Sequence, residues 1–140
     1  MSHPIQTPCH CMKMRRSAGM VLAFYDKMLA PSGVTVRQYS LMHAIHTHTG
    51  CNVRELSEMA ALDRSTLART LKPLIRQGLV IDRKEPGARD SKLALSEQGE
   101  TTRQKAGRLW LKAQTEYEHI LGQEQLTALE DALLVLQTAF

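Results

Sequence analysis

The stretch 52–95 constrains the fold more than any other part of the chain, because the spacing of its apolar residues changes within it. Before Gly78 these residues recur every three or four positions, which is the period of an α-helix. After Gly78 they form two short runs of strand type, Leu79–Ile81 and Lys92–Leu95. Two helices followed directly by a two-stranded hairpin predict a winged helix-turn-helix.

Two helices are predicted in the first part of this stretch. Asn52 is placed to cap a short helix. Its apolar face would carry Val53, Leu56 and Met59. Asp63 is placed to cap the next helix, in which Pro73 allows a kink near the end. The apolar face of this second helix would carry Leu67, Leu71, Leu74 and Ile75. Only the segment 60–62 separates the two helices, which predicts a steep angle between them.

Amphipathic helices are predicted on both sides of this winged module. The apolar positions of 14–29 follow one helical stripe, and a second helix fits Val36–His48. After the hairpin, Ser96 is placed to cap a long helix that ends at about Leu121, and Gly122 is expected to break it. A last helix would carry leucines near heptad spacing, at Leu126, Leu129, Leu133 and Leu136.

We therefore expect a mainly α-helical single domain over 1–140, with a small β-hairpin as the wing. A chain of 140 residues is long enough for one packed domain and short for two. The apolar stripes are too extensive for the winged module to cover, and apolar surface left in water costs about 25 cal/mol per Å². The segments 10–48 and 96–140 are therefore predicted to be dimerisation helices. The alternative is that they pack only within the chain.

Basic residues are concentrated in the winged module. The segment 64–95 holds eight basic and three acidic residues, whereas 96–140 holds four and seven. We therefore expect a polyanion to bind at the module. No run of about 18 apolar residues that would span a membrane occurs. The first residues also lack the apolar stretch of a signal peptide, so we expect a cytoplasmic protein whose three cysteines stay reduced.

The polar face of the helix after Asp63 is the predicted DNA-reading surface, because the major groove, about 12 Å wide, admits one helix. Arg69 is long enough to reach a guanine edge, whereas Lys72 and Arg76 are better placed for phosphates. The hairpin would add cations that reach the adjacent minor groove. The predicted DNA-binding residues are Arg64, Ser65, Thr66, Arg69, Lys72, Arg76, Lys84, Arg89 and Lys92. The alternative is an ordinary solvated basic face.

The segment VRELSEMAALDRSTLARTLKPLIRQGLVIDRK, followed by ARDSKLALSEQG, resembles the MarR family of bacterial winged-helix regulators. The resemblance extends over nearly the whole chain. It implies a homodimeric repressor that binds a pseudo-palindromic operator in double-stranded DNA and is released by an effector. It also implies that Ser65, Thr66 and Arg69 read the groove and that Arg89 is the wing-tip arginine. Gly87 replaces an acidic residue that the family usually has, and Asp90 is the candidate substitute.

The N-terminal region is most similar to the organic-hydroperoxide-sensing repressors of that family. By this resemblance Cys11 is the reactive cysteine and Tyr25 is one of its supporting tyrosines, whereas Val36 replaces the second tyrosine. Cys11 and Tyr25 would be roughly 21 Å apart along one helix, so any contact would come from the other subunit. Oxidation of Cys11 to a sulfenic acid would release DNA. A disulfide between Cys9 and Cys11 would need an unwound helix terminus.

Other interpretations of this region stay open. A zinc or copper(I) site would draw on Cys9, His10 and Cys11, with His43, His46 or His48 as further ligands. A single Cys-x-Cys is a weak metal signal. If the cysteines are inert, the family implies a small phenolic effector in the dimer cleft. A thiol peroxidase and a protein-binding winged helix are the alternatives from other classes. No nucleotide, metalloprotease or Ser-His-Asp motif occurs, so we expect neither enzyme activity nor a cofactor.

Overall fold

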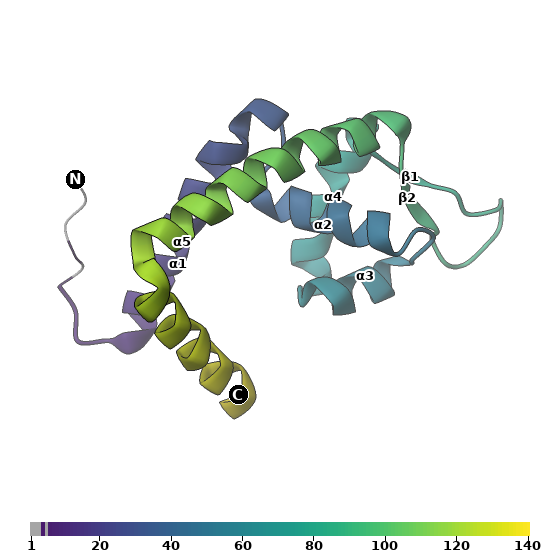
Figure 1. Cartoon of the computed structure of the whole chain (residues 1–140). Helices are drawn as coiled ribbons and strands as arrows, with labels where there is room; N and C mark the ends of the chain where they lie inside the picture. The colour runs from purple at the N-terminus through teal and green to yellow at the C-terminus, as the bar shows by residue number, and fades with distance from the viewer. Residues whose placement is uncertain (1–3, 5) are drawn as a thin grey trace.

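The computed structural model of the chain describes residue 4 and residues 6–140. In chain order its elements are α1 (His10–Leu29), a 3-10 helix (Ala30–Ser32), α2 (Val36–Thr47), α3 (Val53–Ala60), α4 (Arg64–Arg76), β1 (Val80–Asp82), β2 (Leu93–Leu95) and α5 (Glu97–Ala139). Figure 1 shows α3, α4 and the hairpin at one end of the molecule, and α1 alongside α5 at the other. The prediction of a mainly helical fold with a small hairpin wing is confirmed.

Side-chain caps begin α3, α4 and α5 at the predicted positions, Asn52, Asp63 and Ser96. Asn52 Oδ1 accepts a hydrogen bond from Glu55 N at 2.8 Å, and Glu55 Oε1 accepts one from Asn52 N at 3.1 Å. This reciprocal pair satisfies two donors at the start of α3. Ser96 Oγ accepts from Gly99 N at 3.0 Å and donates to Gly78 O at 2.5 Å. Ser96 therefore both begins α5 and ties it to the end of α4.

The core forms where α2 packs against α3, α4, β2 and α5. Its largest fully buried side chains are Leu29, Leu41, Met42, Ile45, Leu56, Leu67, Leu74, Val80 and Leu93. The predicted apolar face of α4 is buried at its three leucines, but Ile75 is 45% exposed, so the prediction for Ile75 was wrong. Because a helix turns about 100° per residue, Ile75 lies about 80° around the axis from Leu67, at the edge of the stripe.

The wing is a short antiparallel hairpin with a one-residue extension. Val80 pairs with Leu95 and Asp82 pairs with Leu93, so both predicted strands are confirmed to within one residue. Cys51 forms an additional bridge to Leu93, whose N–H donates to Cys51 O at 2.8 Å. The bridge, which was not predicted, joins the segment before α3 to the hairpin.

Gly122 interrupts α5, as predicted. Its φ of 77° and ψ of 159° are not helical, and this region of conformational space favours glycine. The part of α5 after Gly122 points away from the rest of the chain (Figure 1). Among the described residues, no helix combines the length and apolar character needed to span a bilayer.

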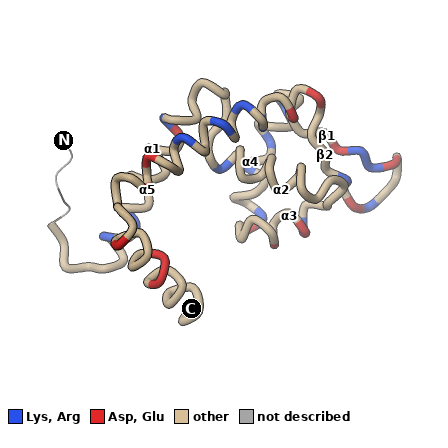
Figure 2. Tube along the Cα trace, in the orientation of Figure 1, with Lys and Arg blue, Asp and Glu red and all other residues tan. Residues whose placement is uncertain are grey.

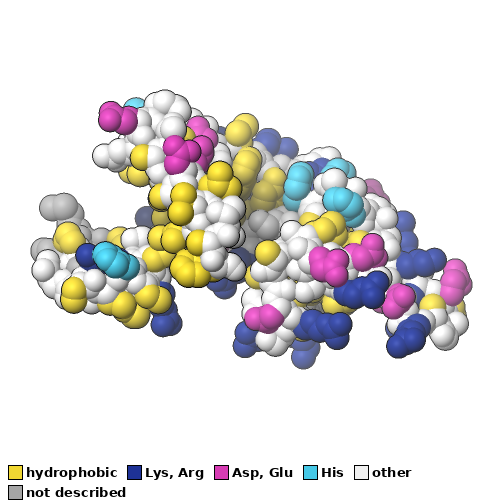
Figure 3. All heavy atoms as spheres, turned by 90° about the horizontal axis from the view of Figure 1, so that it is seen from below, with side chains coloured by type: hydrophobic (Ala, Val, Ile, Leu, Met, Phe, Trp, Pro, Cys, Tyr) yellow, Lys and Arg dark blue, Asp and Glu magenta, His cyan; other side chains and the backbone are white. Residues whose placement is uncertain are grey.

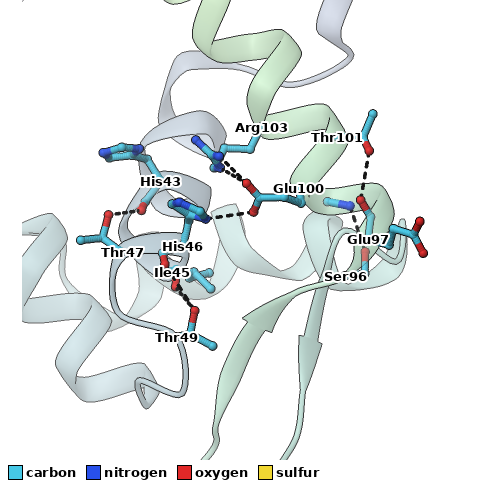
Figure 4. A network of polar contacts seen from close by, with 11 residues as sticks. His43, Ile45, His46, Thr47, Thr49, Ser96, Glu97, Glu100, Thr101 and Arg103 are labelled. Atoms are coloured by element: carbon cyan, nitrogen blue, oxygen red, sulfur yellow. Dashed lines mark hydrogen bonds and ion pairs between the residues drawn. The ribbon is translucent and has the colours of Figure 1, made fainter.

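A polar cluster joins α2 to α5 (Figure 4). His46 Nδ1 lies 3.0 Å from Glu100 Oε2, and Arg103 Nε donates to Glu100 Oε1 at 2.9 Å. The hydrogen bonds from Arg103, followed by the contact with His46, hold the pKa of the Glu100 carboxyl below its ordinary value of 4.5. The cluster therefore connects a helix of the core to the long helix through an ionised carboxylate.

Candidate nucleic-acid interface

The first turn of α4 is fixed by the carboxylate of Asp63. Its Oδ1 accepts hydrogen bonds from Thr66 N and Ser65 Oγ, each at 2.8 Å. The bond from Thr66 N, followed by the bond from Ser65, lowers the pKa of the Asp63 carboxyl. The cap satisfies a backbone donor that has no partner inside the helix. The residues at the start of α4 are therefore held in place on the surface.

The face of α4 opposite its buried leucines carries predicted DNA-binding residues. Counted at about 100° per residue from Leu67, this face includes Ser65, Arg69, Lys72 and Arg76, between about 140° and 200° away. These four side chains are exposed, as is Arg64, while Thr66 is half-buried. Arg69 Nη2 lies 3.4 Å from Thr66 Oγ1, which places the guanidinium over the first turn. Basic residues recur along α4 and the hairpin in Figure 2.

Asp82 organises the base of the wing, a role that sequence reasoning missed. Its Oδ1 accepts hydrogen bonds from Lys84 N at 3.0 Å and from Lys92 N at 2.9 Å. An aspartate at the start of a turn commonly accepts such a bond from the backbone two residues later, so the position of Asp82 before the hairpin loop could have predicted this role. Gly87, at φ 83°, allows the tight turn at the tip. The side chains of Lys84, Arg89 and Lys92 are exposed around this scaffold.

A groove lies between α3, the start of α4 and the wing. Its lining residues are Asn52, Val53, Arg54, Arg64, Lys84, Arg89, Asp90 and Ser91. Four of these side chains are cationic and one is anionic, so the groove is strongly positive. Arg64 lies about 60° around α4 from Leu67 and so faces this groove instead of the far side of the helix. Arg54, in the exposed first turn of α3, was not among the predicted residues.

The cations of the groove have no carboxylate partners within the described part of the chain. The ion pairs found there are His46 with Glu100 and Arg103 with Glu100. Asp90, the candidate for orienting Arg89, forms no ion pair with it over the same residues. The positive charges are therefore available to an external anion.

The three cysteines lie in different environments. Cys9 is the N-cap residue of α1 and Cys11 lies in its first turn, and both are exposed. Cys51 is 5% exposed. Burial, followed by the charge of Glu55, raises the pKa of the Cys51 thiol. An outside reagent can therefore reach Cys9 and Cys11, whereas Cys51 is protected by the core.

Tyr25 is held within its own chain. Its hydroxyl donates to Gln114 Oε1 at 2.5 Å, and its ring centroid lies 6.0 Å from that of Tyr117. Burial, followed by the influence of Tyr117 and Glu118, raises the pKa of the Tyr25 phenol. The tyrosine that the resemblance assigns to a cysteine site therefore joins α1 to α5.

The candidate metal ligands are not brought together. Across residue 4 and 6–140, no three His, Cys, Asp or Glu side chains lie close enough to hold one ion. Cys9, His10 and Cys11 are exposed at the start of α1. The aromatic ring of His43 instead lies between those of Tyr39 and His46, at centroid distances of 6.1 and 6.5 Å.

A second groove, between α1, α2 and the end of α3, is mostly apolar. Its lining residues are Leu22, Val36, Arg37, Ser40, Leu41, Ala44, Met59, Ala60 and Leu62. Arg37 is its one charged side chain. An apolar groove with a single polar anchor has the character of a small-molecule site.

Comparison with known proteins gives one consistent family. Residues 32–91 match the MarR family. The structure of the transcriptional regulator MosR from M. tuberculosis in complex with DNA is similar, with 31% identity over 94% of this chain and 96% of that chain, at a TM-score of 0.79. No curated protein matches the sequence.

Two further structures support the fold alone, because their identities are lower. The repressor CouR bound to p-coumaroyl-CoA has 21% identity and a TM-score of 0.83, over 94% of each chain. The regulator PcaV from Streptomyces coelicolor with its natural ligand has 23% identity and a TM-score of 0.81, over 99% of each chain.

Proposed function

Because the chain belongs to the MarR family of transcriptional regulators, we propose that it is a sequence-specific DNA-binding repressor and not an enzyme. The observation that carries this proposal is the surface of α4 and the wing, whose exposed cations lack carboxylate partners in the described residues. A DNA complex of a relative with 31% identity supports the same class of ligand. The cytoplasm is the expected location, because the operator lies there.

In this proposal α4 enters the major groove and the wing reaches the adjacent minor groove. Arg69 is the base-reading residue, since its guanidinium projects over the first turn and can bond a guanine edge at two points. Lys72 and Arg76 lie further along the same face, where phosphates are nearer than bases. Lys84, Arg89 and Lys92 are carried by a hairpin that Asp82 holds in shape.

The proposed active form is a homodimer on a pseudo-palindromic operator. In the single chain, residues 11–20 of α1 are all exposed. Figure 3 shows hydrophobic side chains gathered over α1 and the C-terminal part of α5, away from the end that α3, α4 and the wing form. The exposed large apolar residues in these two helices include Met12, Met14, Met20, Leu134, Val135 and Leu136. A second copy would remove this surface from water, which is worth about 25 cal/mol per Å².

Two substitutions on one face of α4 test the assignment of roles. Arg69→Gln should lower operator affinity by about 1–3 kcal/mol and relax the base preference at one position. Lys72→Gln should instead weaken binding to all duplexes alike and reduce the salt dependence by about one unit of slope. Fluorescence anisotropy with a panel of duplexes measures both. Equal and sequence-independent effects of the two substitutions would refute the role given to Arg69.

The proposed effector is an organic hydroperoxide that oxidises Cys11. The Cys11 sulfur attacks one peroxide oxygen, the O–O bond breaks, and the products are a sulfenic acid and an alcohol. The thiol is oxidised by two electrons and the peroxide is reduced by two. Burial of Cys51 supports a sulfur at the start of α1, where Cys9 and Cys11 are both exposed in the single chain. The choice of Cys11 over Cys9 rests on the resemblance to the hydroperoxide-sensing repressors.

Titration with cumene hydroperoxide tests the effector. The unmodified protein should lose operator binding after one oxidation per chain, and Cys11→Ser should keep binding. Cys51→Ser is the matched control and should respond like the unmodified protein. Binding that survives oxidation of Cys11 would exclude this effector. Repeated turnover of peroxide with a thiol reductant would indicate a peroxidase instead.

The second candidate effector is a small phenolic or carboxylic molecule in the apolar groove beside Arg37. The groove provides apolar contact from α1, α2 and α3 and one cation for an acidic group. Because it adjoins both α1 and the helix-turn-helix, a ligand there would change their relative position. Calorimetric titration with substituted benzoates, compared between the unmodified protein and Arg37→Gln, tests this alternative.

A further inference from the structure

The basic groove contains one cation that neither α4 nor the wing supplies. Arg54 projects from the first turn of α3 and lines the groove together with Arg64, Lys84 and Arg89. The proposed function assigns base reading to α4 and minor-groove contact to the wing, and it leaves Arg54 without a role. If Arg54 has a specific role, its ligand must lie in the space between α4 and the wing.

The net positive charge of the groove favours binding of an anion. Arg54, Arg64, Lys84 and Arg89 face one space, and Asp90 is the single carboxylate that lines it. None of the four cations forms an ion pair within the described residues. Four cations that share one carboxylate repel one another, so an anion bound among them would relieve an unfavourable interaction.

The walls of the groove are held by separate polar contacts. Val53 N donates to Ser91 Oγ at 3.2 Å, which joins the first turn of α3 directly to the wing. Asp82 fixes the backbone of Lys84, and Asp63 fixes the start of α4. α3 and the wing are therefore joined directly, and the backbone that carries the cations of α4 and of the wing is fixed locally before any ligand arrives. This order lowers the entropic cost of binding.

The position of the groove identifies the anion. If α4 occupies the major groove and the wing occupies the adjacent minor groove, the sugar-phosphate backbone that separates these grooves must run between them. The first helix of a helix-turn-helix also crosses the backbone. We propose that this groove seats one backbone phosphate of bound DNA, and that Arg54 is a ligand of that phosphate. This inference rests on the proposed function.

Arg54→Gln tests the inference, with Arg108→Gln as the control that removes the same charge from an exposed site on α5. Arg54→Gln should bind every duplex about tenfold more weakly. Its salt slope should fall by about one, and its sequence preference should not change. Arg54→Lys should keep the salt slope, because it keeps the charge. Arg108→Gln should match the unmodified protein.

Duplexes in which one phosphate at a time is replaced by a neutral methylphosphonate locate the contact. For the unmodified protein, one position in each half-site should weaken binding about tenfold, and for Arg54→Gln the same replacement should have little effect. Full affinity and salt slope in Arg54→Gln would overturn the inference and leave the proposed function intact. An equal loss in Arg108→Gln, or an altered base preference in Arg54→Gln, would also overturn it. Failure of the unmodified protein to bind any duplex would overturn both.

Discussion

At the scale of single residues, Gly99 is the glycine with the least space for a side chain. A Cβ there would lie 2.0 Å from Leu79 O, a backbone atom that cannot move away alone. The close approach lets Leu79 O accept a hydrogen bond from Ser96 N at 3.0 Å, so it joins the hairpin to α5. The connection between the wing and the long helix therefore depends on the absence of a side chain.

Gly99→Ala should lower the free energy of unfolding by about 3 kcal/mol, because the added methyl overpacks against fixed backbone. Urea denaturation measures the change. Gly107→Ala, in the same helix, is the control, since its Cβ would meet only the end of the Tyr39 side chain, at 3.2 Å. A loss in Gly99→Ala no larger than in Gly107→Ala would contradict the account of this contact.

The features that the sequence did not predict, or predicted wrongly, depend on how separate elements pack together. The Cys51 bridge to Leu93 involves a single residue, so it leaves no period-2 pattern. Arg54 acquires its neighbours only when α3 and the wing come together. The exposure of Ile75, at the edge of the apolar face of α4, depends on whether a neighbouring element packs over that edge. By contrast, the caps at Asn52 and Ser96 depend on contacts within three residues and were predictable.

At the scale of elements, the junction between α2 and α5 should respond to acid. The pKa of Glu100 is lower in the folded chain than its ordinary value of 4.5. A carboxyl with a lowered folded pKa stabilises the fold above its unfolded pKa, and this contribution is lost as pH falls through the folded pKa. Stability should therefore decline below about pH 4.5 in part through Glu100.

Glu100→Gln should make the denaturation midpoint less dependent on pH between about 5 and 3 than in the unmodified chain. Glu116→Gln, an exposed carboxylate further along α5, is the matched control and should leave the pH profile unchanged. Chemical denaturation at a series of pH values measures both. A Glu100→Gln profile that coincides with that of the unmodified chain would refute the role of this carboxylate.

The order of the elements was predictable, because each helix has its own cap, apolar period and end signal. The change from helical to strand spacing after Gly78 and the break at Gly122 are both local properties of the chain. The polar cluster of His46, Glu100 and Arg103 was not predicted, because His46 and Glu100 are 54 positions apart. Their contact depends on how α2 packs across α5.

At the scale of the whole molecule, the uncovered apolar surface predicts a dimer. The unmodified protein should sediment at twice the chain mass of 15.7 kDa. Leu134→Glu, at a side chain that is 60% exposed in the single chain, should shift the equilibrium to the monomer and weaken operator binding. Ile75→Glu is a control for the assembly, because Ile75 is 45% exposed on α4 and should not change the sedimentation mass.

Selection of bound sequences from random duplex DNA under reducing conditions tests the central claim most directly. If two copies of α4 enter successive major grooves while two wings hold the flanking minor grooves, the enriched sequences should be inverted repeats. Their half-site centres should lie about 10–10.5 base pairs apart, or a multiple of that distance. Recovery of a single unrepeated half-site, or of no preferred sequence, would contradict the account.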